Sequence, residues 1–197
     1  MDLVVATRNQ GKLKEIRRLL VDTGVVVRGL DEFPDAPEVE EDGDTFEANA
    51  RKKAEIVAAS VGLWTLADDS GLTVDALGGR PGVHSARYAG PEASDADNNA
   101  KLIEELTEIP LQRRKGAFNC CMALSRPGET TRVFHGRIEG LLLDAPRGEG
   151  GFGYDPLFLV REYGKTMAEL AMEVKNRISH RGQALRQALD WIKTDLL

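Results

Sequence analysis

The sequence predicts an α/β protein with its 197 residues in one domain, a length that suits one domain or one domain with a lobe. The composition, 42% hydrophobic and 29% charged residues, is that of an ordinary globular protein and excludes disorder and fibre. The chain opens with a strand, a loop, a helix and a second strand, the usual start of an α/β layer architecture. A domain of this length needs neither disulfides nor a structural metal to fold.

Hydrophobic periodicity defines the first elements. Two short apolar runs, residues 3–6 and 25–27, predict buried strands. Between them apolar residues recur at helical spacing, and Gly24 is the expected end of that helix. Residues 31–44 are acidic and contain proline, so we expect a loop there.

The middle of the chain predicts a second helix and a third strand. The helix is expected to begin near Asp44, whose carboxylate caps it together with Glu47. Residues 63–67 are apolar and predict a strand that ends in the polar run 68–71. Residues 78–82 contain three glycines and a proline and predict a turn.

Five elements complete the prediction. A third helix is expected over residues 95–108. The strand-like runs 117–125 and 131–140 are separated by a Pro-Gly turn and predict a hairpin. Residues 157–160 predict a last strand, and apolar residues from 185 to 196 predict a final helix.

Composition and charge narrow the classes of function. No apolar run approaches the ~18 residues of a membrane span, and no basic region precedes an apolar stretch at the N-terminus, so we expect a cytosolic protein. The neighbouring Cys120 and Cys121 are expected to be reduced packing thiols in a buried strand, not a redox site. The net charge of −6 argues against a duplex nucleic-acid binder but allows a small anionic ligand.

The first candidate site is the turn between the first strand and the first helix. Free backbone N–H groups and the positive end of the helix dipole make such a turn an anion site, and Lys12 and Arg8 add full charges. It is not a Walker A loop, because Ala6 and Leu13 stand where that motif requires Gly and Ser or Thr. The alternative is a solvated helix start with ordinary surface basic residues. The turn contains Thr7, Arg8, Asn9, Gln10, Gly11 and Lys12.

The second candidate site is acidic. It combines the loop 38–42, which includes Glu40 and Glu41, with the pair Asp68 and Asp69 after an apolar strand. Ligands of open α/β sheets gather at the carboxyl ends of strands. Carboxylates together with phosphate oxygens and water are the ligands that Mg²⁺ prefers. Taken alone, the loop is better interpreted as a charged surface loop, whereas two adjacent carboxylates beside a strand need a compensating cation or donor.

Two further candidates lie in the last third of the chain. Residues 148–156 hold four glycines around Phe152 and Tyr154, whose rings can stack on a base. The alternative is a tight turn with two core aromatic residues. Lys175, His180 and Arg181 are hydrogen-bond donors close together before an apolar helix, where a lone histidine is more often structural.

Six motifs stand in order between residue 4 and about residue 190: Thr7-x-Asn9-x-x-Lys12, Gly43-x-Thr45-Phe46-x-x-Asn49-Ala50-x-x-Lys53-Ala54, Ala67-Asp68-Asp69-Ser70-Gly71-Leu72, Gly78-Gly79-x-Pro81-Gly82, Gly151-Phe152-Gly153-Tyr154-Asp155-Pro156 and Ser179-His180-Arg181-Gly182. Together they resemble the inosine triphosphate pyrophosphatase family, also called dITP/XTP pyrophosphatases. The resemblance implies an elongated central mixed sheet flanked by helices, two lobes with the active-site cleft between them, and a homodimer. It also implies a Mg²⁺-dependent cytoplasmic enzyme that cleaves ITP, dITP and XTP to the monophosphate and pyrophosphate.

The resemblance assigns a role to each matching position. Residues 7–12 and Lys53 hold the triphosphate. Glu40 or Glu41 and Asp69 hold the metal, and Asp69 is also the proton acceptor. Ser70 contacts the substrate. The residues implied around the base are Phe152, Gly153, Tyr154, Asp155, Lys175, His180 and Arg181.

The sequence departs from the family pattern at two places, at Arg8 and in the acidic loop, where Glu40 and Glu41 stand side by side and the choice of metal ligand stays open. Rival functions also stay open. Arg8 stands where the family often has Gly, so a positive φ there is less comfortable. A Maf-like nucleotide pyrophosphatase has a related fold and a different base preference. A non-catalytic nucleotide-binding module has the scaffold without turnover. A single-stranded RNA binder is disfavoured by the sequence pI of about 5.2 and by aromatic residues at 6%.

Overall fold

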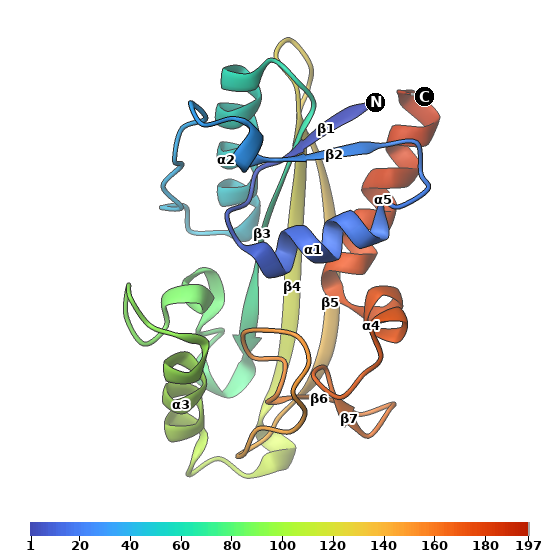
Figure 1. Cartoon of the computed structure of the whole chain (residues 1–197). Helices are drawn as coiled ribbons and strands as arrows, with labels where there is room; N and C mark the ends of the chain where they lie inside the picture. Colours follow the sequence, from blue (N-terminus) through green and yellow to red (C-terminus); the bar gives the residue numbers. More distant parts are fainter. Residues whose placement is uncertain (197) are drawn as a thin grey trace. The chain divides into compact units, whose positions relative to one another are not determined.

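The computed structural model describes residues 1–196 and contains a mixed sheet of seven strands in the order β2-β1-β3-β4-β5-β6-β7 (Figure 1). Strands β1, β2 and β3 pair in parallel, and β5, β6 and β7 pair antiparallel. The α/β class is therefore confirmed. The strands are β1 (Asp2–Val5), β2 (Val26–Gly29), β3 (Thr65–Val74), β4 (Lys115–Ser125), β5 (Arg132–Leu142), β6 (Phe158–Val160) and β7 (Lys165–Thr166).

Five α-helices accompany the sheet within the described residues: α1 (Gln10–Leu19), α2 (Phe46–Val61), α3 (Asp95–Leu106), α4 (Met172–Ile178) and α5 (His180–Asp195). The chain divides into two compact units. The first unit contains residues 1–69, residues 120–136 and the chain from residue 181 on. The second contains residues 70–119 and 137–180. No helix within residues 1–196 has the length and apolar character needed to cross a membrane.

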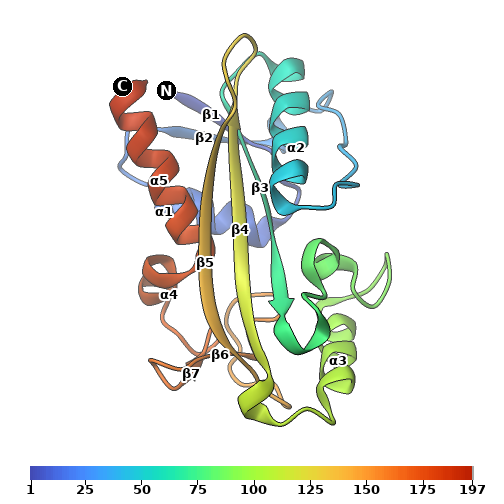
Figure 2. The same ribbon diagram turned by 180° about the vertical axis from the view of Figure 1, so that it is seen from behind.

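The first unit has helices on both faces of its strands, because side chains alternate between the faces. Leu3 and Val5 of β1 pack in one buried cluster with residues of α1 and α5. Val4 packs in the opposite cluster with residues of α2. Cys120 and Cys121 of β4 divide in the same way. Figures 1 and 2 show α2 on one side of these strands and α1 and α5 on the other.

The second unit has its own core. Leu102 and Leu106 of α3 pack with Leu72 and Val74, the last buried residues of β3. Phe118 of β4 and Phe158 of β6 belong to the same cluster, with ring centroids 4.3 Å apart. This core fixes α3 against the strands and the loops that join them.

The helix ends differ from the predicted ends. Helix α1 ends at Leu19, before the expected stop at Gly24. Thr45, and not Asp44, is the N-cap of α2, because its Oγ1 accepts a hydrogen bond of 3.1 Å from the N–H of Ala48. The hydroxyl therefore takes the capping role that we assigned to the Asp44 carboxylate.

The position of the acidic pair in the sheet also corrects the prediction. We expected Asp68 and Asp69 just beyond a strand, but β3 continues through them to Val74. Buried Leu72 and Val74 extend the strand, and Asp68 and Asp69 in its middle contact polar side chains from elsewhere in the chain. His180 likewise begins α5 instead of preceding it. Helix α4 and strand β7 were not predicted.

Candidate active site

The turn between β1 and α1 has the local structure that an anion site requires. Asn9 is the N-cap of α1, and its Oδ1 accepts a hydrogen bond of 3.0 Å from the Lys12 N–H. Thr7 Oγ1 accepts a bond of 3.2 Å from the Asn9 N–H. The positive end of the α1 dipole lies at this turn. Arg8 is exposed and is not among the residues with positive φ, so its departure from the family pattern costs no backbone strain.

A buried network of charges links α1, β3 and α5. Lys12 Nζ lies 3.2 Å from Asp68 Oδ2. Arg181 donates from Nε and Nη2 to the same oxygen, each at 3.3 Å. Its Nη1 donates to Glu15 Oε2 at 2.6 Å. Asp68, Glu15 and Arg181 are buried and Lys12 is half-buried, so the network matches two buried anions with two cations.

The network keeps Asp68 ionised. Burial alone would raise the pKa of Asp68, but the charges of Lys12, Arg181 and Lys53 outweigh it and hold that pKa well below its usual value. The pKa of Arg181 is raised because its acidic neighbours outweigh the effect of burial. Arg181 was expected with the donors around the base, and the structure places it with Lys12 in the first unit.

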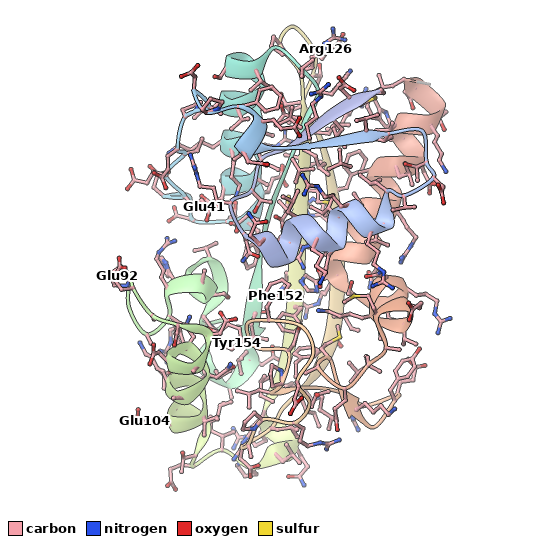
Figure 3. All side chains as sticks on the ribbon, viewed as in Figure 1. Glu41, Glu92, Glu104, Arg126, Phe152 and Tyr154 are labelled. Carbon is pink, nitrogen blue, oxygen red and sulfur yellow. The ribbon has the colours of Figure 1, made fainter. Side chains whose placement is uncertain are left out.

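Helix α2 presents two polar side chains one turn apart. Lys53 forms an ion pair with Glu41, which lies in the loop that leads into α2 (Figure 3). Asn49 Nδ2 donates to Asp69 Oδ2 at 2.9 Å, and Asn49 Oδ1 accepts from the Gly43 N–H at 2.8 Å. One amide therefore joins the acidic loop to the carboxylate of Asp69.

Asp69 is the carboxylate suited to accept a proton. Burial raises its pKa and nearby Glu41 raises it further, and these effects outweigh the hydrogen bond from Asn49 and the charges of Lys12 and Lys53, which lower it. A carboxylate with a raised pKa is a stronger base than one at the surface. Asp68 and Asp69 are therefore neighbours in sequence with opposite pKa shifts.

The repulsion between Glu41 and Asp69 fits a divalent cation. Within residues 1–196 no three carboxylate, histidine or cysteine side chains gather closely enough to hold a metal. Mg²⁺ commonly uses only one or two carboxylates and completes its shell with water and substrate phosphates. Glu41 is half-buried and acts on Asp69, whereas Glu40 is exposed. Of the two candidate ligands, Glu41 therefore has the better position.

In the second unit, residues 151–155 lie between β5 and β6 in the sequence and form a loop that we call the aromatic loop. Figure 3 labels Phe152 and Tyr154 on this loop. Asp155 Oδ2 accepts from the Phe152 N–H at 3.0 Å and from Lys175 Nζ at 2.7 Å. Lys175 Nζ lies 5.3 Å from the centre of the Phe152 ring. A Cβ at Gly151 would overlap the Asp155 carboxylate, so this position requires glycine.

The remaining predicted residues of the second unit have structural contacts. Tyr154 is 5% exposed and donates from its hydroxyl to the Ser85 carbonyl at 2.8 Å, so its side chain belongs to the core. The His180 ring stacks on Phe118, with centroids 5.0 Å apart. Ser70 is half-buried and follows Asp69 directly in β3. Substrate contacts of these three residues stay predictions.

Two buried polar residues were not singled out as site residues. Glu15 lies on the buried side of α1, beside Leu13 and Ile16, and Asn49 lies beside Ala50 in α2. A charged or amide side chain on an otherwise apolar helical face is the local signal that marks both. Their charged partners, Arg181 for Glu15 and Asp69 for Asn49, lie 166 and 20 residues away and cannot be identified from the sequence pattern.

The model of the Ham1 family matches residues 3–191. The chain belongs to the Ham1 family. A dITP/XTP pyrophosphatase of Geobacter sulfurreducens is 59% identical over 183 residues, which cover 93% of this chain and 92% of that protein. A dITP/XTP pyrophosphatase of Bacillus subtilis is 49% identical over 186 residues, 94% of each chain. These similarities confirm the resemblance that the six motifs indicated.

Solved structures of Ham1 proteins share the fold. The Staphylococcus aureus Ham1 protein is 41% identical with a TM-score of 0.88, over 99% of this chain and 100% of that one. A HAM1 protein from Coxiella burnetii is 42% identical with a TM-score of 0.89, over 98% and 99% of the two chains. The Ham1 fold therefore extends over essentially the whole chain.

Proposed function

We propose that this Ham1 chain is a nucleoside-triphosphate pyrophosphatase that hydrolyses ITP, dITP and XTP to the monophosphate and pyrophosphate and so removes deaminated purines from the nucleotide pool. The observation that carries the proposal is the pair Glu41 and Asp69 beside the cations Lys12 and Lys53. The relatives named dITP/XTP pyrophosphatase support the substrate class.

The first unit supplies the groups that a triphosphate and its metal require. The backbone N–H groups at the start of α1, with Lys12, suit phosphate oxygens. Lys53 adds a second cation nearby. Glu41 and Asp69 would hold Mg²⁺, which when bound neutralises charge on the phosphates and lowers the pKa of a coordinated water.

Asp69 is the proposed general base. Water attacks the α phosphorus poorly at neutral pH, so a positioned carboxylate must take its proton. Asn49 orients that carboxylate through its bond to Oδ2. The proton passes to Asp69, and the leaving pyrophosphate is stabilised by Lys12 and Lys53. Asp68 and Arg181 position Lys12, because Lys12 and Arg181 both contact Asp68 Oδ2.

The second unit is proposed to contact the base. Phe152 supplies a flat ring and Lys175 a donor close to it. Hypoxanthine and xanthine present a 6-oxo acceptor where adenine presents an amino donor. An unmatched buried donor costs roughly 1–3 kcal/mol, so ATP should be a poor substrate. Guanine shares the 6-oxo group, and the argument therefore separates ITP from ATP only.

Steady-state pyrophosphate release from ITP, XTP, GTP, ATP, dTTP and UTP, with and without Mg²⁺, tests the proposal. It predicts Mg²⁺-dependent turnover of ITP and XTP well above that of ATP. Preference for dTTP or UTP would instead indicate a Maf-like base preference. Absence of pyrophosphate from every triphosphate would indicate a non-catalytic nucleotide-binding module.

The family resemblance also supports two proposals about the whole protein. We propose that it is a homodimer, which the mass measured by light scattering during size exclusion will test. We propose that it acts in the cytoplasm, where its nucleotide substrates occur and where buried thiols such as Cys120 and Cys121 stay reduced.

A further inference from the structure

Helix α3 holds the backbone of the aromatic loop from outside the proposed site. The N–H of Gly153 donates to Asp95 Oδ2 at 2.7 Å. The carbonyl of the same glycine accepts from Asn99 Nδ2 at 2.9 Å. Asp95 and Asn99 are four residues apart on α3, so they lie on one face of the helix. Both polar groups of one loop residue are thereby bound to one helix.

The bonds hold a residue whose backbone is special. Gly153 has a φ of +60°, in the left-handed region that favours glycine. It lies between Phe152, the residue proposed to stack on the base, and Tyr154, which is anchored in the core. The Tyr154 side chain is anchored in the core, whereas Phe152 is held at its backbone N–H by Asp155, so we expect a change at Gly153 to affect Phe152 more than Tyr154.

Helix α3 is itself rigidly fixed. Ser94 caps it, and the Asp97 side chain accepts from the Ser94 N–H at 2.8 Å in a capping box. Asn98 accepts from the Ala89 N–H at 2.8 Å. The amide oxygen of Asn99 is buried and makes no hydrogen bond within residues 1–196. The bond from Asn99 Nδ2 to the Gly153 carbonyl therefore sets the orientation of the amide.

We propose that Asp95 and Asn99 are positioning residues that fix the aromatic loop so that Phe152 meets the purine base. The inference rests on the proposed function, in which Phe152 contacts the base. It adds that base recognition depends on α3, which supplies none of the proposed contacts with phosphate or metal. Loss of either bond weakens binding of the base and leaves the attack on the α phosphorus intact.

The test compares Asp95→Ala and Asn99→Ala with the wild-type protein in ITP hydrolysis. Losing a hydrogen bond that orders the loop should raise KM for ITP about tenfold and leave kcat within about twofold. Inorganic tripolyphosphate, which has no base, should inhibit all variants with the same Ki. Asp95→Asn keeps an acceptor oxygen for the Gly153 N–H and should restore most of the wild-type KM.

Asp97→Ala is the matched control, because it removes the capping box of α3 without touching Gly153. It should lower the melting temperature and leave KM for ITP unchanged. Equal KM values for the wild type, Asp95→Ala and Asn99→Ala would overturn the inference, and so would an equal rise in KM in Asp97→Ala. A wild-type protein without Mg²⁺-dependent turnover of ITP would instead overturn the proposed function.

Discussion

Two neighbouring carboxylates of the candidate site, Asp68 and Asp69, have different charge environments. Asp68 and Asp69 are adjacent in β3, yet one has a lowered and the other a raised pKa. Asp68 is matched with Lys12 and Arg181, whereas Asp69 accepts a hydrogen bond from the Asn49 amide and lies near Glu41. The first is suited to structure and the second to proton transfer.

Asp69→Asn should keep the fold and lower kcat for ITP at least ~100-fold, because the amide cannot accept the proton of water. The measurement is pyrophosphate release under saturating ITP and Mg²⁺, with circular dichroism to check folding. Asp75→Asn, at an exposed acidic residue beyond β3, is the matched control and should be fully active. A folded Asp69→Asn variant with near-normal turnover would remove Asp69 from the role of base.

Arg181→Ala should be strongly destabilising, by about 3–5 kcal/mol in the free energy of unfolding, because it leaves Asp68 and Glu15 as buried anions that have lost a cation. Urea unfolding measures this change. Arg181→Lys should recover part of it. Arg126→Ala, in the exposed turn between β4 and β5 (Figure 3), is the control and should change stability by less than about 0.5 kcal/mol. Similar unfolding midpoints for the two alanine variants would contradict the network.

At the scale of elements, helix α2 has Thr45 as its N-cap, where the sequence predicted Asp44. Thr45→Ala should lower the free energy of unfolding by about 1 kcal/mol, since Ala48 N–H loses its acceptor. Asp44→Ala should have almost no effect. Urea unfolding of both variants decides between them, and the reverse order of stabilities would place the cap at Asp44 after all.

Strand β4 has two thiols that should be almost inert. Burial raises the pKa of Cys120. Burial, with a smaller contribution from the charge of Glu47, raises the pKa of Cys121 to about 12. Because the thiolate is the reactive form, a raised pKa leaves almost none of it at pH 8. The native protein should react with a disulfide reagent far more slowly than the urea-unfolded protein, which provides two thiols. Two rapid equivalents in the native state would contradict this burial.

Periodicity predicted those elements that have a clear apolar face, including α1, α2, α3 and the hairpin of β4 and β5. It missed α4, which has no side-chain cap at Ala171, and β7, which has only two residues. It also ended β3 too early, because the polar run at Asp68 breaks the apolar pattern. That run stays in the strand because Asp68 is paired with Lys12 and Arg181, and Asp69 accepts a hydrogen bond from Asn49.

At the scale of the whole molecule, the candidate site could be predicted as a set of residue types but not as a set of contacts. The strand-to-helix turn and the acidic residues follow from local pattern and from the family motifs. The bond between Arg181 and Glu15 joins positions 166 residues apart, and nothing local predicts it. Fold and function were therefore accessible from the sequence, whereas the partners of buried charges required the structure.

In the proposed reaction, water attacks the α phosphorus of a deaminated purine triphosphate. Hydrolysis of ITP in ¹⁸O-labelled water, with mass spectrometry of both products, identifies the phosphorus that is attacked. We expect one labelled oxygen in the monophosphate and none in the pyrophosphate, with turnover lost in EDTA and restored by Mg²⁺. Label in pyrophosphate, or release of inosine diphosphate and phosphate, would contradict it.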